Sequence, residues 1–169
     1  TYSAVKQGKV TFKYVTCTRA VTILPKPHPM FSFMKILGLD RRWNVVIIGA
    51  GKLGSALALY QGFFDRGFNV KAVLDIDSNI IGSLLGSVEV ESIRVLEERV
   101  KEHQINIGVV TVPASVAQEV TDQLIASGVK AILNFSPRVL KVPNHIILRN
   151  VDLSVNLEVL SFNLGYNNR

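Results

Sequence analysis

Cysteine is almost absent from this chain of 169 residues, and acidic side chains are absent from its first 39 positions. The single thiol, Cys17, cannot form an internal disulfide, which fits a reducing compartment. No apolar run reaches the roughly 20 residues that span a bilayer. The first residues also lack the charged and then apolar pattern of a secretory signal. We therefore expect a cytoplasmic protein with no membrane partner.

The absence of acidic residues near the N-terminus accounts for the net charge of +6. Residues 1–39 carry six lysine and arginine side chains, and the other 13 basic residues are balanced by all 13 acidic residues of the chain. A basic surface attracts the phosphate backbone of nucleic acids. Any argument from charge for nucleic-acid binding therefore rests on the N-terminal segment alone, because residues 40–169 have no net charge.

Beyond residue 40, apolar strands alternate with amphipathic helical patterns. Strands are predicted at residues 44–49, 69–75, 87–90, 106–111, 130–134 and 145–149. Helices are predicted at residues 52–64, 92–103 and 115–127, with a short helical turn near 78–82. Strands that alternate with helices form right-handed βαβ units, and continuous apolar strands are typical of a parallel sheet. We predict an α/β fold with a doubly wound parallel sheet in the order 3-2-1-4-5-6.

Before residue 40 the pattern is irregular. Residues 1–24 alternate loosely, which predicts two weak strands or unstructured chain. Pro25, Pro27 and Pro29 interrupt both kinds of secondary structure and predict a linker. One or two helical turns are expected at residues 30–37.

The last predicted element, residues 151–164, is apolar on two helical faces. One face carries Leu153, Leu157, Leu160 and Leu164, and the other carries Val155, Val159 and Phe162. A helix that is apolar all round is usually buried on more than one side. The second face suggests a partner subunit in a twofold homodimer. The alternative is a groove in the helix's own domain.

The most specific motif is a glycine-rich turn, G-x-G-x-x-G, which follows the first clear strand and opens a helix. Its residues are Gly49, Ala50, Gly51, Lys52, Leu53 and Gly54. The first glycine permits a tight turn, the second a close approach of the backbone to a pyrophosphate, and the third close packing of the helix on the sheet. The helix N-terminus adds free N–H groups and a partial positive charge. The motif predicts a dinucleotide-binding site.

An acidic residue at the end of the second strand indicates which dinucleotide is bound. Asp75 lies 21 residues after Gly54, where a carboxylate accepts hydrogen bonds from the hydroxyls of the adenine ribose. The same negative charge would repel a 2′-phosphate, and no arginine follows at positions 76–79. We therefore expect NADH or NAD⁺ in preference to the 2′-phosphorylated cofactors.

Two further strand ends meet at the same crevice, the topological switch point of the predicted sheet, where ligands bind in such folds. Residues 111–113 follow the fourth strand, either as ligand contacts or as a simple loop in which Ser115 caps the next helix. Phe135 and Ser136 follow the fifth strand. Phe135 either forms a wall of the nicotinamide site or belongs to the core.

Motifs for catalysis are absent from the sequence. The three histidines lie away from the carboxyl ends of the predicted strands, and there is no metal-ligand cluster, no Ser-x-Gly elbow and no pair of carboxylates at a suitable spacing. A dehydrogenase needs further residues that bind substrate and move a proton. Only residues 150–169 follow the last predicted strand. We expect a binding protein whose output is a change of shape, and not an enzyme.

Several motifs together resemble the Rex family of bacterial redox-sensing transcriptional repressors. They lie in residues 35–40, 45–57, 134–137, 140–143 and 150–153. The resemblance implies a homodimer in which a winged helix binds operator DNA, a Rossmann domain binds NADH or NAD⁺, and a C-terminal helix is exchanged between subunits. It also implies that NADH closes the dimer and releases the DNA, whereas NAD⁺ competes without that closure.

The resemblance also implies residue roles. It implies that the glycine turn binds the pyrophosphate and that Asp75 binds the ribose. The residues that would line the crevice are Thr111, Val112, Pro113, Phe135 and Ser136. Tyr60 and Asp152 match a tyrosine–aspartate pair of the family that is thought to sense the redox state of the cofactor.

The chain accordingly divides into an N-terminal segment (1–34), a Rossmann domain (35–150) and a dimer-exchange helix (151–169). The first segment departs from the family, because it lacks a helix-turn-helix pattern and is too short for a winged helix. We expect a start that is truncated, frame-shifted or introduced by cloning, in a chain that senses nucleotide and dimerises without binding its operator. The alternatives are a small NAD-dependent oxidoreductase and a CoA-binding domain, although a ribose 3′-phosphate would crowd Asp75.

Overall fold

The computed structural model describes residues 5–6, 9–10 and 41–167 and divides the chain into two compact units, residues 1–40 and 41–169. In the first unit, β1 (Val5–Lys6) pairs antiparallel with β2 (Lys9–Val10). The expected linker and the expected helical turns at residues 30–37 lie outside the described residues.

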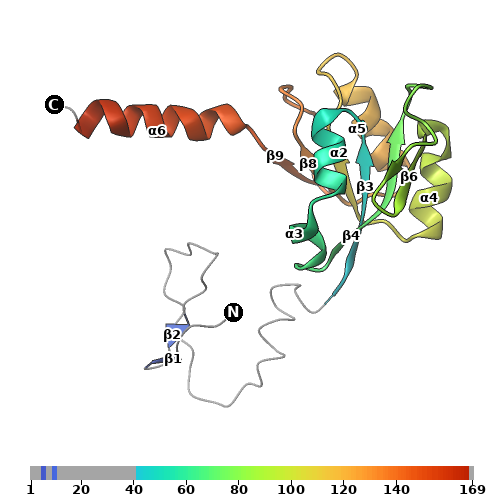
Figure 1. The fold of residues 1–169 in the computed structure, drawn as a ribbon, viewed down its shortest axis with the longest axis horizontal. Coiled ribbons are helices and arrows are strands. Elements are labelled where there is room, and N and C mark those ends of the chain that lie inside the picture. Colours follow the sequence, from blue (N-terminus) through green and yellow to red (C-terminus); the bar gives the residue numbers. More distant parts are fainter. Residues whose placement is uncertain (1–4, 7–8, 11–40, 168–169) are drawn as a thin grey trace. The chain divides into compact units, whose positions relative to one another are not determined.

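The second unit is built on a seven-stranded sheet (Figure 1). Its strands are β3 (Trp43–Ile48), β4 (Phe68–Asp75), β5 (Leu84–Leu85), β6 (Val88–Ser92), β7 (Ile107–Val110), β8 (Ala131–Asn134) and β9 (Ile147–Asn150). They lie in the order β5-β6-β4-β3-β7-β8-β9, and all neighbours are parallel except β5 and β6. The six parallel strands follow the predicted order 3-2-1-4-5-6, so the doubly wound α/β fold is confirmed.

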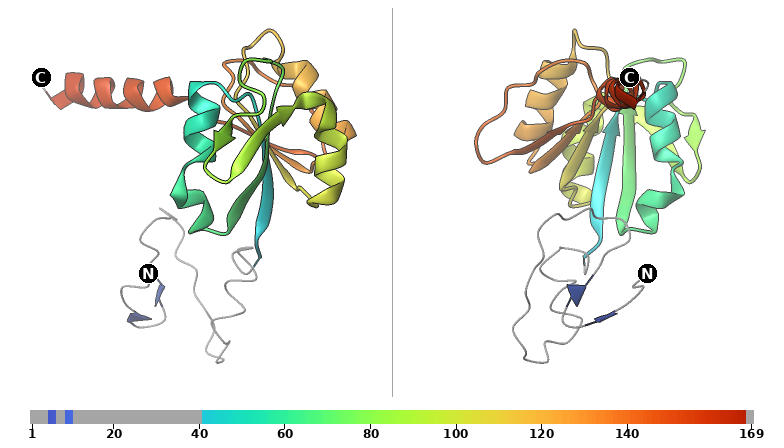
Figure 2. Two further views of the ribbon diagram at one scale, coloured as in Figure 1. Left: turned by 45° about the vertical axis from the view of Figure 1, so that its right-hand side comes forward. Right: turned by 90° about the vertical axis from the view of Figure 1, so that its left-hand side faces the viewer.

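Helices lie on both faces of this sheet (Figure 2). These helices are α2 (Lys52–Ala58), α3 (Gln61–Phe64), α4 (Leu96–Glu102) and α5 (Ala117–Ala126), whereas α6 (Leu153–Asn167) follows β9 and extends away from the sheet. One face carries α2 and α3, and the other carries α4 and α5. Among the described residues, none of the helices has the length and apolar character needed to cross a membrane.

The central strands are buried on both sides. On the face of α4 and α5, Ile48 and Leu74 pack with Leu124 in one apolar cluster. On the opposite face, Ile47 and Val73 belong to a second cluster. Successive side chains of a strand point to opposite faces, so the continuous apolar sequences of β3 and β4 supply both clusters.

The first predicted helix, residues 52–64, is wrong as a single element. The structure has two helices there, because the backbone of Tyr60 is extended, with φ −74° and ψ 104°. Gly62 is a poor helix former, and the ring of Tyr60 packs closely over it. The interruption places Tyr60 between α2 and α3.

Smaller corrections apply to two other predicted elements. The helix predicted at residues 92–103 begins as a 3₁₀ turn, η1 (Ile93–Val95), before α4. The helical turn predicted near residues 78–82 is a single hydrogen-bonded turn, in which the amides of Ile80 and Ile81 donate to the carbonyl oxygen of Asp77 at 3.1 Å.

Candidate functional site

A cavity of about 580 Å³ lies where β3, β4 and β7 end. Of the predicted cofactor residues, it is lined by Gly49, Gly51, Asp75, Thr111, Val112 and Pro113. Its remaining walls come mainly from η1 and α5. The fold therefore brings the glycine turn, the acidic residue and the loop after β7 together at the switch point of the sheet.

The glycine turn has the geometry that its spacing predicts. Gly49 has φ +100°, in the region that favours glycine, and a Cβ there would lie 2.9 Å from the carbonyl oxygen of Thr111. A Cβ on Gly54 would lie 1.8 Å from the carbonyl oxygen of Gly49. In contrast, a Cβ on Gly51 would meet nothing within 4 Å. A side chain at Gly49 or Gly54 would therefore collide with the backbone, whereas the space beside Gly51 is free.

The carboxylate of Asp75 is anchored by backbone amides. Its Oδ2 accepts from the amide of Ala50 at 2.6 Å, and its Oδ1 accepts from those of Ile76 and Asp77 at 2.6 and 2.9 Å. The bond to Ala50 joins the end of β4 to the glycine turn, which sequence spacing did not indicate. A carboxylate has about four lone-pair sites, so Asp75 keeps acceptor capacity toward the cavity.

Thr111 holds the glycine turn against β7. Its hydroxyl lies 2.9 Å from the carbonyl oxygen of Ile48 and 2.8 Å from that of Gly49, and it donates its single proton to this pair. Thr111 is thus a support of the turn as well as part of the cavity wall. Ser115 is not the cap of α5, because the residue at that position is Val116 and no side chain caps the helix.

The second strand end, after β8, lies outside this cavity. Phe135 is half-buried and packs against the apolar cluster of Ile47 and Val73, as the core alternative predicted. Ser136 is buried, and its hydroxyl has no hydrogen-bond partner among the described residues. A nicotinamide contact for these two residues stays a prediction.

Asn134 belongs to the motif at residues 134–137, but the sequence did not predict that it organises the turn that contains Phe135 and Ser136. Its Nδ2 lies 3.1 Å from the carbonyl oxygen of Ser136, 3.0 Å from that of Arg138 and 2.9 Å from Oδ1 of Asn150. Its Oδ1 accepts from the amide of Ser136 at 2.9 Å. The available signal was a polar residue at the end of an otherwise apolar strand.

Tyr60 and Asp152 are not joined by a hydrogen bond within the part of the chain that the structure describes. The ring of Tyr60 is half-exposed and contacts Phe63 edge-on, with centroids 5.3 Å apart. Asp152 accepts from the amide of Ser154 at 2.9 Å and from its hydroxyl. The hydroxyl bond and then the amide bond hold the pKa of Asp152 below its ordinary range. Asp152 is therefore a carboxylate at neutral pH.

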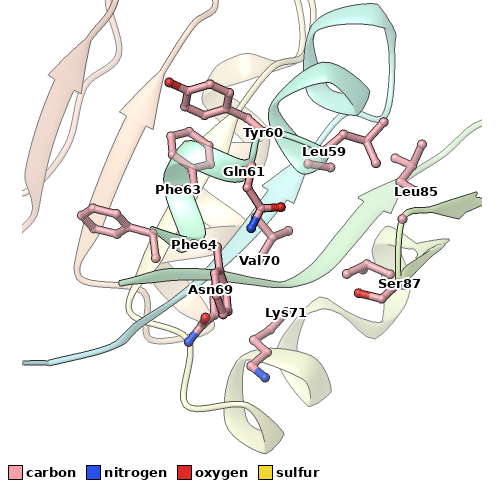
Figure 3. A pocket seen from close by; sticks show the side chains of 14 residues that line it. Leu59, Tyr60, Gln61, Phe63, Phe64, Asn69, Val70, Lys71, Leu85 and Ser87 are labelled. Carbon is pink, nitrogen blue, oxygen red and sulfur yellow. The ribbon is translucent and has the colours of Figure 1, made fainter. Parts of the chain in front are cut away.

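A second cavity, of about 400 Å³, lies beside Tyr60 (Figure 3). Aromatic side chains of Tyr60, Phe63 and Phe64 border it, and Lys71 of β4 also contributes to its lining. The sequence did not predict this cavity, whose walls come mainly from α3, β4 and the residues of and after β5.

Helix α6 follows β9 and is exposed over the side chains that the structure describes. All of its side chains that the structure describes are exposed, and its larger apolar ones range from 50% exposure at Val155 to 69% at Phe162. The alternative of a groove in its own domain is therefore wrong for this chain. A contiguous apolar surface of this kind marks an interaction site.

Comparison with protein families identifies the domain type. Residues 40–138 match the family described as the CoA binding domain. This match covers β3 to the loop after β8, and hence the glycine turn, Asp75 and the loop at residues 111–113.

Among curated proteins, the redox-sensing transcriptional repressor Rex of Syntrophomonas wolfei is 70% identical over 136 residues, which are 80% of this chain and 65% of that protein. Rex of Carboxydothermus hydrogenoformans is 53% identical over 131 residues, 78% of this chain and 63% of that protein. The chain thus spans slightly less than two thirds of the length of these relatives.

Among solved structures, RSP, a Rex-family repressor, has a TM-score of 0.78 at 41% identity, covering 82% of this chain and 66% of RSP. RSP in complex with NADH has a TM-score of 0.77 at the same identity, covering 82% and 67% of the two chains. RSP with NAD⁺ and operator DNA has a TM-score of 0.75, also at 41% identity, covering 82% and 64%.

Proposed function

Because this chain belongs to the Rex family of redox-sensing transcriptional repressors, and its residues 40–138 to the CoA-binding domain family, we propose that it is the NADH- and NAD⁺-sensing part of such a repressor and not an enzyme. The complexes of RSP with NADH, and with NAD⁺ and operator DNA, support this by similarity. Operator DNA is the proposed partner of the whole protein, which would act beside the chromosome in the bacterial cytoplasm.

The observation that carries the nucleotide proposal is the position of Asp75. Its carboxylate lines the cavity and is held by the amide of Ala50, so the ribose acceptor and the pyrophosphate turn form one connected site. The open space at Gly51 leaves room for the phosphates. The first amides of α2 have no partner within the helix and face an anion favourably.

The other walls of the cavity suit a flat aromatic base. Ile93, Val112 and Val116 line it with apolar atoms, and Gln123 adds a polar group. Apolar walls with a few polar groups are typical of cofactor sites. We place the adenosine half of NADH here, and the nicotinamide half toward Phe135 and Ser136 after β8.

Calorimetric titration with NADH, NAD⁺, NADPH and CoA in parallel tests this site. We expect NADH to bind most tightly, NAD⁺ more weakly, NADPH weakly because its 2′-phosphate meets Asp75, and CoA negligibly. Tight CoA binding without NADH binding would overturn the proposal in favour of the second candidate, a CoA-binding domain, which the family match favours. Turnover of NADH with a small substrate would instead indicate an oxidoreductase.

We also propose that the protein is a homodimer joined through α6. The apolar surface of this helix is exposed in the single chain, whereas a twofold exchange would cover it in both subunits. Within the described part of one chain no hydrogen bond joins Tyr60 to Asp152, and we propose that they pair between subunits. NADH would close this dimer and release operator DNA, and NAD⁺ would compete without closing it.

A further inference from the structure

One buried side chain lies between the turn after β8 and the segment that leads into α6. Asn134 is the last residue of β8 and is 1% exposed. Its register partners are Val110, at the end of β7, and Asn150, at the end of β9. It therefore stands between the strand that ends at the cofactor crevice and the strand that precedes α6.

Asn134 forms hydrogen bonds both to the turn after β8 and to the segment that leads into α6. Toward the crevice side, its Oδ1 accepts from the amide of Ser136 at 2.9 Å, and its Nδ2 donates to backbone carbonyls of the same turn. Toward α6, its Nδ2 donates to Oδ1 of Asn150 at 2.9 Å, and its carbonyl oxygen accepts from the amide of Val151 at 2.8 Å. One residue thus binds the turn through its side chain and the segment before α6 through both its side chain and its backbone.

The planar amide makes this link stiff. Its Nδ2 has two hydrogens but faces three acceptors, so a shift of the turn after β8 changes how these hydrogens are shared with Asn150. Buried polar groups that lose their partners are unfavourable. The turn and the base of α6 are therefore expected to move together.

The same turn has a polar group that a ligand or water is expected to satisfy. The hydroxyl of Ser136 is buried and has no partner among the described residues. Ser136 is also the residue whose backbone amide and carbonyl oxygen both bind Asn134. A group that binds the hydroxyl would act directly on the residue that Asn134 holds.

We propose that Asn134 is a positioning residue that transmits nucleotide binding at the turn of Ser136 to the base of α6, through its bond to Asn150. The inference rests on the proposed function, since it needs NADH to bind in the crevice. It adds the route by which the site and the dimerisation helix communicate, and it assigns Asn150 as the receiving group.

The substitution Asn150→Ala tests the link without opening the core, because Asn150 is exposed whereas Asn134 is buried. Asn150→Asp keeps an acceptor oxygen for Nδ2 of Asn134 and serves as the rescue variant. Asn144→Ala, an exposed asparagine in the turn before β9, is the matched control. All four chains are measured with and without NADH.

Two quantities are measured: NADH affinity by calorimetry, and the NADH-dependent change in hydrogen exchange of the Val151 amide, which binds Asn134 directly. In the original chain, Asn144→Ala and Asn150→Asp, NADH should slow this exchange. In Asn150→Ala, the slowing should shrink at least about fivefold, while NADH affinity stays within about threefold. If Asn150 had a merely structural role, Asn150→Ala would change the hydrogen exchange of the Val151 amide equally with and without NADH.

The possible results distinguish a failure of this inference from a failure of the proposed function. If the original chain does not bind NADH, the proposed function fails, and the inference with it. If NADH binds but leaves exchange at Val151 unchanged, or slows it equally in Asn150→Ala, the inference is overturned and the proposed function stands.

Discussion

The carboxylate of Asp75 supports the glycine turn through Ala50 and, in our proposal, also receives the ribose. We expect Asp75→Ala to weaken NADH binding by about tenfold to a hundredfold, since a hydrogen bond to a charged group contributes roughly 1.5–3 kcal/mol. The preference for NADH over NADPH should shrink, because the charge that repels the 2′-phosphate is gone. Calorimetry with both cofactors measures this.

The control for Asp75 is Asp77→Ala, at an exposed carboxylate two residues away that accepts from the amide of Asn79. It should leave the affinity for NADH nearly unchanged. If Asp75→Ala binds NADH as tightly as this control does, the ribose role is wrong.

Substitutions at Gly54 and at Gly51 test two different roles of glycine in one turn: close packing of the helix at Gly54, and close approach of the ligand at Gly51. A Cβ at Gly54 would overlap the carbonyl oxygen of Gly49, whereas one at Gly51 would meet open space. We expect Gly54→Ala to lower the free energy of unfolding by about 1–3 kcal/mol. Gly51→Ala should leave stability nearly unchanged but weaken NADH binding. Urea unfolding and calorimetry on the same two variants provide the check, and equal stability loss in both would contradict it.

Between elements, β6 and α4 are joined by a bidentate ion pair. Nε and Nη2 of Arg99 donate to the carboxylate of Glu91, at 2.9 Å to Oε2 and 2.7 Å to Oε1. These hydrogen bonds from Arg99 hold the pKa of Glu91 below its ordinary range, against the opposing effect of desolvation. Glu102 and Glu98 also contact Arg99 on its outer side.

This ion pair predicts a dependence of stability on pH. A carboxylate whose pKa is lowered by folding stabilises the fold above its unfolded pKa, about 4.3 for glutamate, and loses this contribution as pH falls through the folded pKa. Glu91→Gln should therefore be less stable than the original chain at pH 7, and the difference should shrink below about pH 4. Urea unfolding from pH 7 to pH 3 measures it. A difference that stays constant with pH would show that the charge is unimportant.

Helix α6 is an element whose large apolar side chains, where the structure describes them, are at least half exposed in one chain. Leu160→Lys should raise the dimer dissociation constant by at least about tenfold, because burying a leucine contributes roughly 1.5–3 kcal/mol. The domain itself should keep its stability, since Leu160 is 58% exposed in the single chain. Asn156→Lys, on the same helix, is the control. Sedimentation equilibrium measures both, and an unchanged dimer in Leu160→Lys would exclude this face from the interface.

At the scale of the whole molecule, our proposal is that a cofactor crevice is coupled to α6. If NADH binds the folded site and not the unfolded chain, as proposed, a concentration of about 100 times the dissociation constant should stabilise the fold by roughly 2.7 kcal/mol. Thermal unfolding with increasing NADH should show a rising midpoint, and CoA at equal concentration should show none. A midpoint insensitive to NADH would contradict the site.

Much of this molecule follows from local sequence patterns. The alternation of apolar strands with helices, the order of the six parallel strands and the shape of the glycine turn are all predictable from the sequence. They depend on periodicity, chain connectivity and glycine backbone freedom, which short stretches such as residues 44–54 already contain. The interruption at Tyr60 was missed, because an aromatic ring over Gly62 depends on packing that propensity does not record.

The sequence by itself thus determined the fold class, the glycine turn and the position of Asp75 at a strand end, since each is a property of neighbouring residues. Only the tertiary structure decided that Asp75 binds Ala50, that Asn134 links Ser136 to Asn150, and that α6 stands exposed. The bonds of Asp75 to Ala50 and of Asn134 to Asn150 join residues far apart in the chain. They depend on which side chains meet once the sheet has formed, and no local pattern encodes that.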